Sequence, residues 1–292
     1  MRLRARDREW TFPRERPLLM GILNATPDSV SDRARLDTLE GRVAHGRALV
    51  AAGADIVDVG GESGRTDTAP VSAEVEIARI EPTVRALADE GVAVSVDTYR
   101  AEVAAAAYDA GAVLINDVGG LHDPAMVEVA ARSGAGLVVM HTRAAPKEES
   151  FPGYDDPVAD VLAFLEERLQ HAVDAGVEPE QIVLDPGLDY AKTPAESIEI
   201  LRRLPELHGL DRPLLLAVSN KYFVGMVTGR PPDERLAGTL AALAHGVDLG
   251  AAIARVHDVR AAADYLAVRA ALRGESAPVL AGDPADESLK WL

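Results

Sequence analysis

Cysteine is absent from the 292-residue sequence. Its absence excludes disulfides, thiolate nucleophiles and cysteine-ligated metals. Long hydrophobic runs are also missing, since no apolar stretch reaches the ~20 residues that a helix needs to span a bilayer. The first residues, MRLRARDREWTFPRERP, are basic but are not followed by an apolar segment. We therefore expect no signal peptide and a cytoplasmic location.

Positive charge is scarce relative to negative charge. The sequence has 30 Lys and Arg against 47 Asp and Glu, a formal net charge of −17. Such acidity opposes binding to nucleic acids and to anionic membranes, so we expect neither partner. It still permits a local cationic pocket for phosphate. Hydrophobic residues make up 48% and charged residues 26%, which is ordinary for a globular protein and predicts a folded chain.

Apolar runs bounded by turn residues recur along the whole sequence. They are almost continuous in Val, Ile and Leu, which is typical of parallel strands covered on both faces. These runs, which we predict as strands, cover residues 18–24, 55–61, 92–98, 112–118, 136–141, 181–187, 214–219 and 251–258.

Segments with a helical period, rich in Ala, Leu, Glu and Arg, separate these runs. The clearest are 38–52, 73–90, 100–110, 157–175 and 233–247. Eight strand–helix alternations without a linker predict a single (β/α)8 TIM barrel, an α/β fold, over residues 17–274. A doubly wound open sheet has the same alternation and is the alternative. We expect residues 1–16 and 275–292 to be loosely held extensions.

The predicted strands share a second property, which is that each delivers polar residues near its C-terminal end. Active sites of such barrels collect at this end of the strands. The polar residues are Asn24, Asp58, Asp97, Asn116, Asp117, His141, Asp185, Ser219, Asn220, Lys221, Arg255, His257 and Asp258. We predict that they converge on one mouth of the barrel.

The distribution of charge in this set indicates a ligand class. Three potential cations, Lys221, Arg255 and His257, come from the last two strands, where barrels often bind phosphate. Carboxylates and amides on the third, fourth and sixth strands suit a flat heterocycle with N–H donors and ring acceptors. The residues alone therefore predict a site for a phosphorylated, nitrogen-rich planar ligand.

Several motifs, in this order and spacing, resemble the dihydropteroate synthase family of pterin-binding barrels. They are MGILNATPDSVSD, GADIVDVGGES, VSVDTYR, LINDVGG, VLDPGLDYAKT, VSNK, ERLAGTLA and RVHDV, and they extend over about residues 17–272. The resemblance implies an enzyme that joins 6-hydroxymethyl-7,8-dihydropterin pyrophosphate to p-aminobenzoate and releases pyrophosphate. It also implies a homodimer.

The resemblance also implies roles for individual residues. Asp97, Asn116 and Asp185 would hydrogen-bond the pterin, Lys221 would donate to its carbonyl or ring nitrogen, and Met140 would lie against the ring. The residues that would bind pyrophosphate are Asn24, Arg65, Arg255 and His257, and Asn24 would also ligate Mg²⁺. The residues implied as catalytic are Asp97, Asp185, Lys221, Arg255 and His257.

The sequence departs from the family pattern in the loops that form and close the second-substrate pocket. The altered positions are Val30, Arg33, Ala34, Gly64, Arg65, Thr66, Asp189, Tyr190, Ala191 and Asn220. We assign Val30, Gly64, Tyr190, Ser219 and Asn220 to that pocket. Asn220 stands where the family has Arg, which removes a cation near the expected benzoate carboxylate. A charge-assisted hydrogen bond contributes about 1.5–3 kcal/mol.

Three functions agree with this pattern. The first is a dihydropteroate synthase with a relaxed pocket. The second is a paralogue that binds pterin pyrophosphate but uses another nucleophile or has little synthase activity. The third is a methyl-tetrahydrofolate-binding methyltransferase, which has no need of Arg255 and His257 as pyrophosphate ligands.

Overall fold

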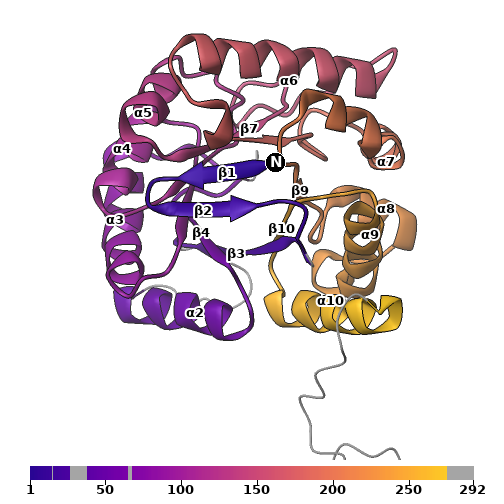
Figure 1. Cartoon of the computed structure of the whole chain (residues 1–292), viewed down its shortest axis with the longest axis horizontal. Helices are drawn as coiled ribbons and strands as arrows, with labels where there is room; N and C mark the ends of the chain where they lie inside the picture. The colour runs from indigo at the N-terminus through magenta and orange to yellow at the C-terminus, as the bar shows by residue number, and fades with distance from the viewer. Residues whose placement is uncertain (15, 27–37, 65–67, 275–292) are drawn as a thin grey trace, which may run out of the picture.

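The predicted barrel is present in the computed structural model, which describes residues 1–14, 16–26, 38–64 and 68–274. Eight parallel strands form the inner ring and the helices surround it (Figure 1). The strand order is β8-β7-β6-β5-β4-β3-β10-β9, and a parallel bridge between Leu184 and Leu214 joins β8 to the segment that leads into β9. The open-sheet alternative is thereby excluded.

The barrel strands match the eight predicted runs. They are β3 (Leu18–Asn24), β4 (Ile56–Gly60), β5 (Val94–Thr98), β6 (Leu114–Asp117), β7 (Gly136–Met140), β8 (Ile182–Asp185), β9 (Leu215–Ala217) and β10 (Ile253–Val256).

The helices follow the strands on the outside of the barrel. They are α2 (Leu39–Ala51), α3 (Ala73–Asp89), α4 (Ala101–Asp109), α5 (Ala125–Ser133), α6 (Pro157–Asp174), α7 (Pro194–Arg202), α8 (Tyr222–Thr228), α9 (Leu236–Asp248) and α10 (Val259–Arg273). Short 3-10 helices are η1 (Pro179–Gln181), η2 (Leu204–Leu210) and η3 (Pro232–Glu234). No helix in these described ranges is long and apolar enough to cross a membrane.

Alternation along each strand divides the core into two layers. Successive strand residues point to opposite faces, so every second side chain enters the barrel. In β3, Leu18 and Met20 belong to the inner cluster, while Leu19 and Leu23 pack in the outer cluster beneath the helices. Asn24, Asp58, Asp97, Asn116, Asp185 and Arg255 occupy inward positions of this same pattern. Asp117 instead accepts the backbone N–H groups of Gly119 and Leu121, and Asp258 caps α10, so these two residues do not join the predicted cluster.

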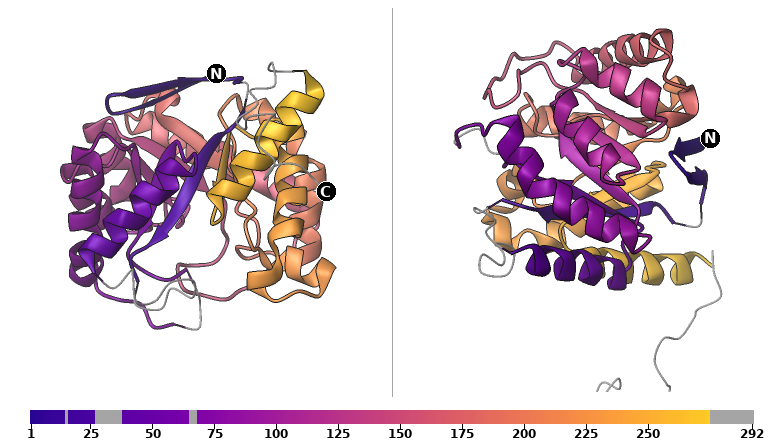
Figure 2. Two further views of the ribbon diagram at one scale, coloured as in Figure 1. Left: turned by 90° about the horizontal axis from the view of Figure 1, so that it is seen from below. Right: turned by 90° about the vertical axis from the view of Figure 1, so that its left-hand side faces the viewer.

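Residues 1–12 differ from the predicted loose extension. They form a hairpin of β1 (Arg2–Ala5) and β2 (Arg8–Thr11), which lies across one end of the barrel (Figures 1 and 2). Leu3, Ala5 and Phe12 are buried and pack into the inner cluster. The hairpin therefore closes the N-terminal end of the barrel, so ligands reach the core from the opposite end.

Local sequence signals set the helix boundaries. Gly53 and Gly111 follow α2 and α4 with φ of 110° and 115°, a backbone region that glycine adopts without strain. Asp156 accepts hydrogen bonds from the first turn of α6, and Thr193 with Glu196 forms a capping box at the start of α7. The loops that precede these two helices are thus fixed next to the barrel mouth.

Candidate active site

The strand register places the predicted polar residues side by side at the barrel mouth. Asn24 pairs with Gly60, Gly60 with Asp97, and Asp97 with Asn116. A Cβ on Gly60 would lie 3.6 Å from the Cβ of Asp97 and 3.8 Å from Oδ1 of Asn24. Glycine therefore leaves an open space between these two polar side chains.

Arg255 forms the centre of the site. Its Nε donates to Oδ2 of Asp58 at 2.6 Å, and its Nη2 bonds Oδ2 of Asp97 on a different strand. The same Asp58 oxygen accepts a hydrogen bond from the Asn116 amide at 3.1 Å. Three strands are thereby joined through one guanidinium, and its position is fixed inside the barrel mouth.

The carboxyl groups at this centre are difficult to ionise. Burial raises the pKa of Asp97 to about 7, although the Arg255 charge acts in the opposite direction. Burial also raises the pKa of Asp185. The hydrogen bond from the backbone N–H of Gly187 and the charges of Lys221, Lys192 and Arg255 act in the opposite direction and lower this pKa. The site therefore holds the carboxyl groups of Asp97, which is partly buried, and Asp185, which is buried, beside the cations of Lys221 and Arg255.

Lys221 lies at the same mouth. Its Nζ donates to the Leu188 carbonyl at 2.8 Å and stands 4.6 Å from the centre of the Tyr190 ring. Burial lowers its pKa, and the charges of Asp189, Asp185 and Asp97 oppose that change. The charges of Asp97, Asp185, Lys221 and Arg255 thus act on one another, so these four residues lie in one region, as the sequence predicts.

His257 is close to this group but differs from the expected cation. Its Nδ1 lies 2.9 Å from Oγ of Ser219, whose oxygen also accepts the backbone N–H of His257. Burial and the charges of Arg255 and Lys221 lower its pKa to about 4. The free protein therefore holds a neutral imidazole at pH 7, which can bind phosphate through a hydrogen bond.

A cavity of about 680 Å³ opens beside this centre. Among its lining residues are Asp97, Lys221, Gly64, Tyr190 and Asn220. A Cβ on Gly64 would lie 3.6 Å from the Tyr190 hydroxyl, so the loops after β4 and β8 approach each other here.

Ser219 and Asn220 also lie on the side of α9, and of these two predicted pocket residues only Asn220 lines the larger cavity. Both line a smaller cavity of about 150 Å³. Asn220 has φ of 56°, and its Oδ1 accepts the Thr239 hydroxyl at 3.3 Å. Its amide oxygen is thus held toward α9, although the residue also lines the larger cavity. Val30, Arg33, Ala34, Arg65 and Thr66 lie outside the described residues.

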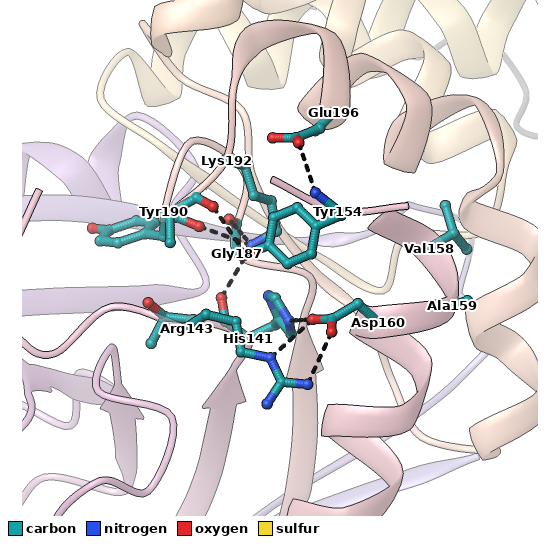
Figure 3. A network of polar contacts seen from close by, with 12 residues as sticks. His141, Arg143, Tyr154, Val158, Ala159, Asp160, Gly187, Tyr190, Lys192 and Glu196 are labelled. Carbon is teal, nitrogen blue, oxygen red and sulfur yellow. Dashed lines mark hydrogen bonds and ion pairs between the residues drawn. The ribbon is translucent and has the colours of Figure 1, made fainter. Parts of the chain in front are cut away.

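Lys192, for which the sequence predicts no role, fixes the loop after β8. It is fully buried, and its Nζ donates to the carbonyls of Gly187 at 2.8 Å, Tyr190 at 2.9 Å and His141 at 3.3 Å (Figure 3). The Tyr154 hydroxyl donates to the Ala191 carbonyl at 2.9 Å. The loop therefore holds the Tyr190 ring at the cavity wall.

His141 has a structural environment, although it follows β7 at the predicted rim. Its Nε2 lies 2.8 Å from Oδ1 of Asp160, which also accepts Nε of Arg143 (Figure 3). Burial, with the Lys192 charge, lowers the pKa of His141 to about 3. Met140, the preceding residue and the last of β7, is buried.

We expect Lys192→Met to lower the free energy of unfolding by about 3 kcal/mol, because buried carbonyl groups lose their donor at about 1–3 kcal/mol each. Tyr154→Phe removes one bond from the same loop and should cost only about 1 kcal/mol. Urea unfolding of both variants measures these values. Equal losses in the two variants would contradict the central position assigned to Lys192.

The fold and the site together define the class of this protein: a (β/α)8 barrel with its cavity at the C-terminal ends of the strands, the position of enzyme active sites in this fold. The family model described as "Pterin binding enzyme" matches residues 20–257. The chain belongs to this family.

Its relatives include dihydropteroate synthases. The chain is 43% identical over 249 residues to the dihydropteroate synthase of Bacillus subtilis, with 85% of each chain covered. The structure of Xanthomonas albilineans dihydropteroate synthase with 4-aminobenzoic acid is 40% identical, with a TM-score of 0.86 over 93% of this chain and 98% of that one. The same enzyme in complex with 7,8-dihydropteroate has a TM-score of 0.84 and 39% identity over 94% of this chain and 99% of that chain.

Proposed function

We propose that the chain is a transferase of the dihydropteroate synthase type, which acts in folate biosynthesis. It joins 6-hydroxymethyl-7,8-dihydropterin pyrophosphate to p-aminobenzoate and releases pyrophosphate. The observation that carries this proposal is the single mouth where Arg255, Asp97, Asp185 and Lys221 meet, in a chain whose relatives bear that name. The relatives reported above do not favour a methyltransferase.

The inner carboxyl groups suit the pterin. Asp97 and Asp185 accept hydrogen bonds from its N–H groups, Asn116 pairs with its donor and acceptor edge, and Lys221 donates to an oxygen or ring nitrogen. Met140 supplies apolar contact to the ring. Burial raises the pKa of both carboxyl groups because little water reaches them. The N–H donors of a bound pterin supply the hydrogen bonds that water does not.

The pyrophosphate takes the cationic flank of the mouth. Arg255 offers a planar fork of donors, and the neutral imidazole of His257 offers one hydrogen bond. Arg65, outside the described residues, is a further ligand from the loop after β4. Breaking the C–O bond to pyrophosphate leaves positive charge on the pterin methylene. The negative charges of Asp97 and Asp185 stabilise it.

Asn24 suits Mg²⁺ that is shared with the pyrophosphate. This ion often takes one or two protein oxygens and fills its other positions with water and substrate phosphates. The Asn24 Oδ1 borders the space that the absent Cβ of Gly60 leaves open. No cluster of three or more acidic, His or Cys ligands occurs among the described residues. Bound Mg²⁺ would neutralise charge on the departing pyrophosphate.

The second substrate enters through the larger cavity. An aromatic amine is a neutral nucleophile, so the site needs to position it rather than deprotonate it strongly. The Tyr190 ring, held in place by the Lys192 loop, supplies a flat apolar wall for the amine ring. The protein works as a cytoplasmic homodimer in this proposal.

Two measurements test the proposed function. Calorimetry should show binding of the pterin pyrophosphate with Mg²⁺ to the free protein, and more readily than binding of p-aminobenzoate alone. A turnover assay should then show pyrophosphate release that depends on p-aminobenzoate. Failure to bind the pterin would exclude the proposal, whereas tight binding without turnover would favour a pterin-binding paralogue.

A further inference from the structure

Asp189 is a fixed carboxylate between the loop after β8 and the start of α8. Its Oδ2 accepts the backbone N–H groups of Tyr222 at 2.5 Å and Phe223 at 3.4 Å. Its Oδ1 accepts the Ser197 hydroxyl at 3.1 Å, and its own N–H donates to the same hydroxyl at 3.0 Å. These bonds hold the carboxylate in one orientation.

This carboxylate belongs to the wall of the larger cavity. Asp189 lines it together with Tyr190, Asn220, Lys221 and Tyr222. The ammonium group of Lys221 is engaged with the Leu188 carbonyl, and the Asn220 amide oxygen accepts from Thr239. The Lys221 ammonium is therefore already bonded within the protein, although its charge still acts on Asp189.

Acidic residues outnumber lysines in the lining of this cavity. Its described lining contains six acidic residues and three lysines: Glu62, Glu76, Asp97, Glu148, Glu149 and Asp189 against Lys147, Lys192 and Lys221. Lys192 is bonded to three carbonyls and Lys147 to Ser63 and Thr68. Glu62 and Glu76 pair with Arg100 and Asp97 pairs with Arg255, whereas Asp189 forms no salt bridge with the residues that the structure describes. A second carboxylate entering from a substrate would meet like charge here.

We propose that Asp189 is a specificity-determining residue that disfavours a carboxylate on the acceptor amine. The pocket then accepts an aromatic amine with a neutral para substituent at least as well as p-aminobenzoate. This inference rests on the proposed transferase function and names the acceptor class of that same site. The residue acts through its charge, which its hydrogen bonds to Tyr222, Phe223 and Ser197 hold at the cavity wall.

A substrate series tests this directly in the wild-type protein. We expect kcat/KM for p-aminobenzamide, the neutral analogue, to equal or exceed that for p-aminobenzoate, with pyrophosphate release as the readout. A preference of more than about 10-fold for p-aminobenzoate would overturn the inference. Absence of pyrophosphate release with either amine would instead count against the proposed function.

Two variants test the residue itself. Asp189→Asn keeps an oxygen to accept from Tyr222, and Asp189→Gly suits the φ of 64° at this position. Both should shift the kcat/KM ratio toward p-aminobenzoate by about 10-fold, the effect of one charge-assisted hydrogen bond. An unchanged ratio in folded variants would contradict the assignment.

Asp211 offers a matched control. It is another aspartate with positive φ, 50°, its side chain is 84% exposed, and it does not line the cavity. Asp211→Asn and Asp211→Gly should leave the ratio of the two amines unchanged. A similar shift in these controls would assign the effect to the overall charge of the protein rather than to Asp189.

Discussion

Replacing Arg255 by alanine should lower kcat/KM by about 10³-fold, the upper range for loss of one preorganised electrostatic group. The guanidinium bonds both Asp58 and Asp97, and in the proposed reaction it also binds the departing pyrophosphate. Its removal leaves the buried Asp58 and the partly buried Asp97 without their cation. The free energy of unfolding should therefore fall by about 3–5 kcal/mol, the cost of breaking a buried ion pair on one side.

Steady-state kinetics and urea unfolding measure the two effects separately. Arg255→Lys keeps a charge but loses the planar fork, so it should recover stability more than activity. Arg260→Ala, an exposed arginine on α10, is the control and should change neither quantity by more than a small factor. Full activity in Arg255→Ala would remove this residue from the site.

A double-mutant cycle separates structure from chemistry. Asp58→Asn removes one of the charges that Arg255 neutralises, so combining the two substitutions should cost less stability than their sum. Activity should not recover in the double variant, because the pyrophosphate would still lack its arginine. Additive stability losses would show that the Asp58 contact is energetically unimportant.

The barrel could be predicted because each strand is a short run of apolar residues between turn signals. The N-terminal hairpin could not, because its strands have four residues each and two of the four in β1 are arginines. Only Leu3 and Ala5 of β1 face the core. A pattern with two inward residues is too short to separate a strand from an irregular segment.

For the site, the sequence predicted which residues lie together but not which contacts they make. The ends of the strands indicated Asp97, Asp185, Lys221 and Arg255 as neighbours, because all strands deliver their ends to one mouth. The sequence did not indicate that Arg255 bonds Asp58, which is 197 positions away, or that His257 is neutral. These properties depend on burial and on pairing across the barrel, which a linear pattern does not contain.

The loop after β8 also has contacts that the sequence does not indicate. A lysine in a loop ordinarily indicates a solvent-exposed charge, yet Lys192 is fully buried because three backbone carbonyls converge on it. Asp189 likewise is a departure in the sequence, and its two backbone partners on α8 are visible only in the fold. A substitution in this loop thus acts on the cavity through backbone contacts.

Replacing Asp97 by asparagine should lower kcat/KM by about 10²-fold, because a charge-assisted hydrogen bond to the pterin and the bond to Arg255 are both weakened. Asparagine keeps the size of the side chain, so the variant should fold. Calorimetry with the pterin pyrophosphate should show the corresponding loss of affinity. Wild-type affinity in this variant would contradict the role of the carboxylate.

The pH dependence gives an independent check on the same residue. Burial, with the charges of Asp58 and Glu76, raises the pKa of Asp97 from 3.8 to about 7, while Arg255 and Lys221 act against that rise. Pterin binding needs the ionised form, so wild-type kcat/KM should increase as the pH rises through about 7. The profile of Asp97→Asn should lack this rise.

Stability should change in the opposite direction. The folded state holds the Asp97 proton more tightly than the unfolded chain, so its contribution to stability is complete below about pH 4 and is lost as the pH rises through about 7. The free energy of unfolding of the wild type, relative to Asp97→Asn, should therefore fall across this interval while its activity increases. Ionisation of Asp97 permits pterin binding but destabilises the fold, so it should raise activity and lower stability together. If activity and stability instead changed in the same direction, a group other than Asp97 would control the pH profile.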